Sequence, residues 1–144
     1  MVYKKFWLRM LVTVLLFGMT VLGCDNGTTG NGADSALNGT WIWQEGTPVN
    51  FNWEINNGNF ETTMNGTLHG RGTFSTSGNI FSLVNTHFYG ISIRNDLEAR
   101  WYTISELNNL GIVTMVNQEH NYKLNGNTLT FFWQAGGSAK YSRF

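Results

Sequence analysis

Apolar and polar side chains alternate from Val49 to Asn56, and this alternation constrains the fold more than any other feature of the sequence. Successive side chains of a β-strand point to opposite faces, so the pattern gives this segment one apolar and one polar face. Such a strand belongs in an antiparallel sheet that buries one face. The same period recurs more weakly at Phe60, Thr62 and Met64, and near the end of the chain at Tyr122, Leu124, Leu129, Phe131 and Trp133.

Short segments rich in asparagine and glycine separate the alternating runs. They are 56–59 (Asn-Asn-Gly-Asn), 65–66 (Asn-Gly), 77–79 (Ser-Gly-Asn) and 125–127 (Asn-Gly-Asn). Asparagine and glycine tolerate the positive φ that tight hairpins require, so we expect each segment to reverse a strand.

The positions of the runs and turns predict an all-β fold. The expected strands span about 39 to 45, 49 to 56, 59 to 65, 67 to 76, 79 to 88, 112 to 124, 128 to 134 and 138 to 143. Short strands joined by hairpins, without long crossover helices, predict a small antiparallel meander β-barrel of about eight strands, or else a sandwich.

One segment departs from the strand pattern. Thr103 and Glu106 have the spacing of a capping box, and Gly111 is well placed to end a helix, so we expect a short helix from about 104 to 109. The helix either covers one mouth of the barrel, with Leu107 and Leu110 facing inward, or is a helical turn that bridges two strands.

The first residues of the chain have the layout of a signal peptide. Lys4, Lys5 and Arg9 precede an apolar run from Met10 to Leu22, which is shorter than the roughly 20 residues of a membrane span. The tetrapeptide 21–24 (Val-Leu-Gly-Cys) resembles the lipobox of bacterial lipoproteins. The resemblance implies that residues 1–23 are removed and that Cys24 carries the lipid. The alternative is an ordinary secretory signal followed by a free thiol, which an oxidising compartment makes a liability.

The regions that follow Cys24 differ in composition. Residues 24–36 are small and polar, and we expect them to form a flexible, lipidated tether; residues 37–144 have the size of one domain. Loss of Lys4, Lys5 and Arg9 from nine basic and nine acidic residues leaves the mature chain with a formal net charge of minus three. This charge argues against nucleic-acid binding. We therefore expect a protein of the cell envelope, lipid-anchored to a bacterial membrane whose identity and leaflet the sequence leaves open.

Two short motifs at the ends of the domain resemble the calycin pattern. Gly39-Thr40-Trp41 begins the first expected strand, and Arg143 lies in the last. In calycins a tryptophan at this place packs against an arginine from the last strand, which implies that Trp41 and Arg143 close the barrel. Residues 37–144 as a whole are similar to the lipocalin-like domains of small bacterial lipoproteins. The Thr-Asp-Tyr-like turn of true lipocalins and their long helix near the C-terminus are not visible.

The sequence offers little for catalysis or metal binding. His69, His87 and His120 lie far apart, without other ligands at metal-site spacing. Glu54 and Glu61 can face each other across a hairpin, but on the expected polar face. No nucleophile elbow or phosphate-binding loop is visible. We therefore expect no enzyme activity, no metal and no cofactor.

Two kinds of function remain. The first is a binding protein that holds a small apolar or amphipathic ligand inside the barrel, with these candidate lining residues: Phe51, Trp53, Phe60, Phe74, Phe131 and Trp133. Bulky side chains can instead fill an eight-stranded barrel completely. The second is a surface interaction protein, such as an adhesin, an inhibitor or an envelope-assembly factor. Its candidate contacts are residues 87–91 and the pair Trp101-Tyr102, for which core packing is the simpler explanation.

Overall fold

The computed structural model describes residues 32–46 and 49–144. The expected signal peptide (1–23) and the expected lipid attachment at Cys24 lie outside these residues. In the described ranges no helix is both long and apolar enough to pass through a membrane. The strands are β1 (Gly39–Glu45), β2 (Phe51–Asn56), β3 (Asn59–Met64), β4 (Thr67–Ser77), β5 (Ile80–Tyr89), β6 (Trp101–Thr103), β7 (Asn117–Asn125), β8 (Thr128–Phe132) and β9 (Ser138–Arg143). The short helical elements are η1 (Ser35–Leu37), α2 (Gly90–Ile93) and α3 (Ile104–Asn109).

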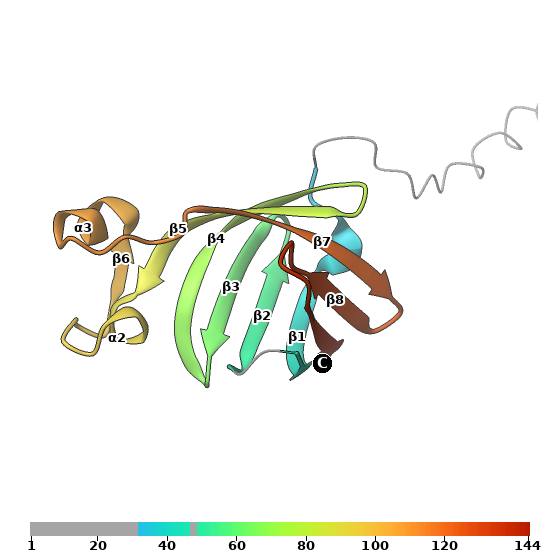
Figure 1. Cartoon of the computed structure of the whole chain (residues 1–144), viewed down its shortest axis with the longest axis horizontal. Helices are drawn as coiled ribbons and strands as arrows, with labels where there is room; N and C mark the ends of the chain where they lie inside the picture. Colours follow the sequence, from blue (N-terminus) through green and yellow to red (C-terminus); the bar gives the residue numbers. More distant parts are fainter. Residues whose placement is uncertain (1–31, 47–48) are drawn as a thin grey trace, which may run out of the picture.

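Eight of the nine strands in the described part of the chain form a closed antiparallel barrel (Figure 1). The strand order is β4-β3-β2-β1-β9-β8-β7-β5-β6, and β4 also pairs with β5, which closes the ring and leaves β6 outside it. β1 pairs with β9, so the first and last strands lie side by side. The prediction of a small meander barrel with short helices is confirmed.

The strand and helix boundaries follow the sequence pattern closely. The predicted strands 39–45 and 138–143 and the helix 104–109 have the bounds of β1, β9 and α3. The strand predicted from 112 begins only at Asn117, where the chain joins β5 opposite Val84. β6 was not predicted, because three residues are too short to show a period.

Trp41 is the largest fully buried side chain in the described core of the barrel. Its side chain is 0% exposed, and its indole Nε1 donates a hydrogen bond of 2.7 Å to the carbonyl oxygen of Leu37. Trp41 is paired directly with Arg143 across β1 and β9, and the guanidinium carbon of Arg143 lies 4.6 Å from the centroid of the Trp41 ring. The two residues of the calycin-like pattern therefore lie in contact at the seam between the first and last strands.

The residues just before η1 pack against the barrel, contrary to the tether predicted up to residue 36. Gly32 bridges to Thr76, and the Asp34 carboxylate accepts hydrogen bonds from the Ala36 amide and the Tyr122 hydroxyl. Ala33 packs against the hydrophobic core. The boundary predicted from composition was therefore wrong for residues 32–36, because Asp34 finds partners on strands far away in the sequence.

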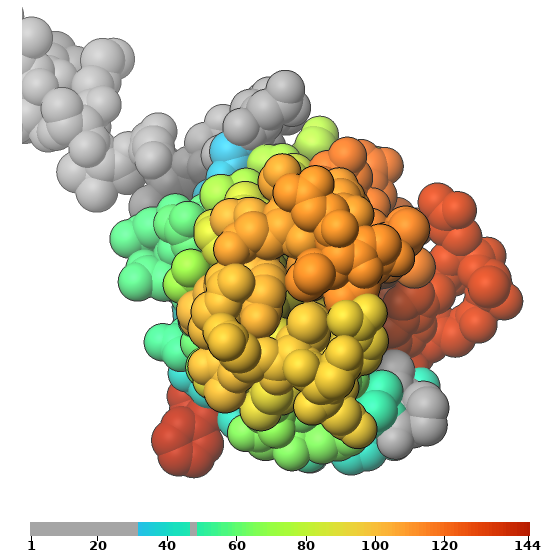
Figure 2. Space-filling model, turned by 90° about the vertical axis from the view of Figure 1, so that its left-hand side faces the viewer, coloured from blue at the N-terminus to red at the C-terminus, as the bar shows by residue number. Residues whose placement is uncertain are grey.

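Residues 90–112 form a small lobe beside one end of the barrel (Figure 1). The second half of β5 pairs with β6 instead of β7, and a separate cluster of Phe88, Tyr102 and Leu107 packs beneath the helices. The space-filling view from this side shows the yellow and orange lobe in front of the barrel body (Figure 2).

Both ends of α3 are defined by local hydrogen bonds. Thr103 and Glu106 form the predicted capping box. At the other end the Gly111 amide donates to Asn108 and the Ile112 amide to Leu107, a Schellman motif that needs the positive φ (72°) of Gly111. Leu107 is buried, but Leu110 is 46% exposed, so the alternative in which both leucines face inward was wrong for Leu110.

Candidate functional site

A cavity of about 310 Å³ occupies the end of the barrel interior next to the lobe. Its apolar wall comes from β2, β3, β5, β8 and the residue that follows β8, and its members are Phe51, Trp53, Phe60, Leu83, Phe88, Phe131 and Trp133. The rings of this wall contact one another: Trp53 lies 5.5 Å from Phe60 and 5.4 Å from Phe131, between centroids. The volume is at the lower end of the range for small-molecule sites.

Five of the six residues predicted to line a ligand cavity lie together around it. They are Phe51, Trp53, Phe60, Phe131 and Trp133. The sixth, Phe74, does not line the cavity but stacks on Phe81, with 4.8 Å between centroids and 13° between planes. Phe81 in turn contacts Phe131 and Trp53, so these aromatic rings fill the interior beyond the cavity. The barrel is thus filled in one part and hollow in the other.

Polar side chains from β3, β4, β5, β7 and β9 also face the cavity. They are Thr62, His69, Asn85, Gln118, His120 and Tyr141. Thr62 is satisfied locally, because its hydroxyl exchanges two hydrogen bonds with the backbone of Gly70. Asn85 donates from Nδ2 to the Met115 carbonyl, at the point where β7 leaves β5. Lys, Arg, Asp and Glu are all absent from the described residues that line the cavity.

Burial shifts the titration of three of these side chains. It lowers the pKa of His69 and of His120, because desolvation disfavours the imidazolium. Burial raises the pKa of Tyr141. The Trp53 indole opposes that rise but is not in hydrogen-bond geometry with the phenol, since Trp53 Nε1 has no partner among the described residues. The cavity therefore holds neutral side chains near pH 7.

Sequence reasoning found the aromatic wall but not these polar residues. The wall follows from the period-two pattern, whereas His69 and His120 were considered only as metal ligands. Among the described residues, no group of three or more His, Cys, Asp or Glu side chains could hold a metal ion. The position of the histidines inside the barrel depends on strand pairing, which the local sequence does not reveal.

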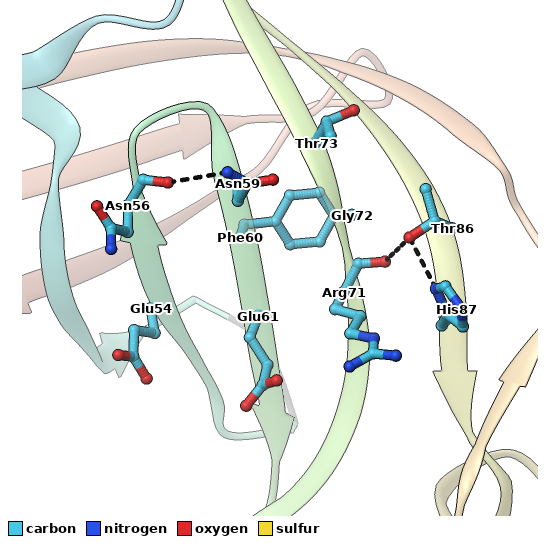
Figure 3. A pocket seen from close by; sticks show the side chains of 10 residues that line it. All are labelled: Glu54, Asn56, Asn59, Phe60, Glu61, Arg71, Gly72, Thr73, Thr86 and His87. Carbon is cyan, nitrogen blue, oxygen red and sulfur yellow. Dashed lines mark hydrogen bonds between the residues drawn. The ribbon is translucent and has the colours of Figure 1, made fainter.

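A larger, shallow hollow of about 570 Å³ lies on the outer face of β2 to β5 (Figure 3). Its central row runs from Glu54 through Glu61 and Arg71 to His87, each a direct cross-strand neighbour of the next. Glu54 and Glu61 do face each other across the hairpin, as the sequence indicated. The hollow is wide open to water, and all its described lining residues except Phe60 and Gly72 are polar or charged, so a ligand there would bury less apolar area than one in the interior cavity. The interior cavity is the better candidate site.

The aromatic residues considered for a partner surface are largely packed in the lobe. Phe88 and Tyr102 belong to its buried cluster. Tyr89 and Trp101 contact each other edge to face at 5.3 Å, and Arg71 lies over the Trp101 ring at 4.5 Å. Packing within the lobe therefore accounts for most of these side chains.

The fold and the cavity define a small closed β-barrel, an architecture that lipocalin-like proteins share and that is compatible with ligand binding. Comparison with known protein families, curated proteins and solved structures finds no match to this chain.

Proposed function

We propose that this protein is a non-catalytic binding protein that holds one small apolar or amphipathic molecule inside its barrel. The observation that carries the proposal is the interior cavity of about 310 Å³, walled by aromatic rings and edged by a few polar groups. This combination is typical of small-molecule sites. At about 30 Å³ for each water-sized group, the volume suits a ligand of about ten non-hydrogen atoms.

The proposed cellular setting is the surface of a bacterial membrane. The lipobox-like tetrapeptide ending at Cys24 supports this setting, together with an apolar run too short to span a bilayer. Two or three acyl chains on Cys24 would anchor the protein stably, whereas one would not. The barrel would then meet ligands at the membrane surface.

Native mass spectrometry of the protein, purified from its own membrane or loaded with 2-methylnaphthalene, tests ligand binding. We expect one bound molecule per chain. A Gly70→Leu variant should lose it, because a Cβ on Gly70 would lie 3.4 Å from Thr62 Oγ1 and 3.5 Å from Phe88 Cε1, both at the cavity wall. Thr73→Leu is the matched control, since Thr73 is exposed on the same strand. Absence of any bound molecule in the wild type, or equal binding by Gly70→Leu, would overturn the proposal.

A further inference from the structure

His69 enters the cavity because of an irregularity in the pairing of β3 with β4. Thr62 pairs with Gly70 and Thr63 with Leu68, so His69 is an extra residue without a partner on β3. Such a β-bulge breaks the alternation of side chains and can re-aim one of them. The rings of Phe51 and Phe88 contact the imidazole edge to face, at 5.2 and 5.7 Å between centroids, and hold its plane.

The lobe determines which nitrogen of His69 carries the proton. Ser92 Oγ, in α2, donates its single hydrogen to the Tyr89 carbonyl at 2.7 Å. His69 Nδ1 lies 3.2 Å from the same Ser92 Oγ, which can therefore only accept from it. This network assigns the hydrogen to Nδ1 and leaves Nε2 with a lone pair. Nε2 has no hydrogen-bond partner among the described residues, and the lowered pKa of His69 favours this neutral form.

Asn85 supplies a second acceptor to the same cavity. Its Nδ2 is held by the Met115 carbonyl at 2.9 Å, which fixes the orientation of the amide and leaves Oδ1 without a donor in the described part of the chain. Oδ1 also lies 3.4 Å from the position that a Cβ on Gly70 would take, beside the cavity. His69 Nε2 and Asn85 Oδ1 are therefore two free hydrogen-bond acceptors on residues of the cavity wall; the buried Nε1–H of Trp53, which also has no partner among the described residues, is a donor.

The described lining residues carry no charged side chain, and this argues against amphiphilic ligands with an ionised carboxylate. An ionised carboxylate would lose its water without gaining a cationic partner, which costs far more than the transfer of a neutral hydroxyl. A hydroxyl or N–H group would instead find an acceptor already in place. We propose that the cavity selects an uncharged ligand that presents an O–H or N–H donor to His69 Nε2, with Asn85 Oδ1 as a second acceptor. The inference rests on the proposed ligand-binding function.

Three two-ring probes test this selection by equilibrium dialysis at about pH 7.5: 2-naphthol, its isostere 2-methylnaphthalene, and 2-naphthoate. A purely apolar cavity would prefer the methyl compound, because a hydroxyl costs free energy to desolvate. We expect 2-naphthol to bind about tenfold more tightly than 2-methylnaphthalene, the effect of about one good hydrogen bond. We expect 2-naphthoate to bind most weakly.

Variants locate the selection at His69. His69→Phe keeps an aromatic ring but removes the acceptor, so the preference should reverse in favour of 2-methylnaphthalene. His87→Phe makes the same replacement on the outer face and should leave the preference unchanged. Ser92→Ala removes the acceptor that holds the proton on His69 Nδ1, so it should reduce the preference for 2-naphthol over 2-methylnaphthalene severalfold. This variant tests the inference even if His69→Phe does not fold.

The outcomes separate the inference from the proposed function. Binding of 2-methylnaphthalene or 2-naphthoate as tightly as 2-naphthol would overturn the inference but leave ligand binding intact. So would a 2-naphthol preference that survives in both His69→Phe and Ser92→Ala. If none of the three probes binds, the proposed function fails and the inference fails with it.

Discussion

The guanidinium of Arg143 lies over the indole of Trp41, and this contact joins the last strand of the barrel to the first. Arg143 Nη2 also donates to the Ala36 carbonyl, so one side chain fastens both β1 and the segment before it. The contact combines a cation–π interaction with a hydrogen bond from a charged group. Its loss should therefore weaken the barrel seam without creating a large cavity.

Arg143→Ala should lower the free energy of unfolding by about 1–3 kcal/mol. Arg143→Lys keeps the charge but loses the flat guanidinium, so it should fall between Arg143→Ala and the wild type. Urea denaturation measures both. Lys123→Ala, at an exposed position of β7, is the control and should have little effect. Equal stability of Arg143→Ala and Lys123→Ala would contradict the role of Arg143 at the seam.

The capping box at the start of α3 should support the lobe. Thr103→Ala removes the hydroxyl that accepts from the Glu106 amide at 3.2 Å and should destabilise the lobe by about 1 kcal/mol. Ser105→Ala removes an exposed hydroxyl from the same helix and is the matched control. Amide hydrogen exchange in residues 104–112 should quicken in Thr103→Ala only; equal exchange in the two variants would refute the assignment.

Glu106 gives the same capping box a pH dependence. The Thr103 amide, then the Arg100 and Thr103 side chains, lower the pKa of Glu106 to about 2. A carboxyl group with a depressed folded pKa stabilises the fold above its unfolded pKa of 4.5 and loses that contribution as the pH falls towards 2. Protection of α3 from hydrogen exchange should therefore decrease over this interval, and the decrease should be smaller in Glu106→Gln.

Local chemistry explains why the hairpins and helix were predictable from the sequence. The β2–β3 turn needs two residues with positive φ, and Asn57 (46°) and Gly58 (80°) supply them. The α3 bounds likewise follow from Thr103, Glu106 and Gly111, all within a few residues of the helix. Each of these signals consists of a few neighbouring residues at the boundary of a strand or helix, so it can be recognised without knowledge of the tertiary structure.

The candidate site was predictable only in part, because its polar groups depend on contacts distant in sequence. The inward direction of His69 follows from a bulge in the β3–β4 pairing. The position of its ring proton on Nδ1 follows from the contact with Ser92 in the lobe. Asn85 faces the cavity at the point where the strand paired with β5 changes from β7 to β6. Phe74, in contrast, has the right alternation but lies too far along β4, because periodicity gives the face of a residue and not its depth in the barrel.

The lipid attachment predicted at Cys24 has a direct test. Cys24→Ala should abolish metabolic labelling with a radioactive fatty acid, because the thiol is the proposed site of acylation. The variant should also retain its signal peptide, which its larger mass would show. Cys24→Ser, which keeps a small polar side chain, should behave in the same way. Labelling that persists in either variant would contradict lipidation at this residue.

The half-buried histidines His69 and His120 should make the free energy of unfolding depend on pH in a higher interval than the Glu106 carboxyl group does. The folded pKa values of His69 and His120 lie below the unfolded value of 6.5, so below that pH the unfolded chain binds protons that the folded chain resists. The free energy of unfolding should therefore fall as the pH decreases from about 7.5 to about 5.

Urea denaturation across this interval should show a flatter profile of unfolding free energy against pH for the double variant His69→Phe/His120→Phe. Both replacements keep an aromatic ring at the cavity wall, so loss of packing alone would lower the whole profile without changing its slope. An unchanged slope in the double variant would show that these two histidines are not the source of the pH dependence.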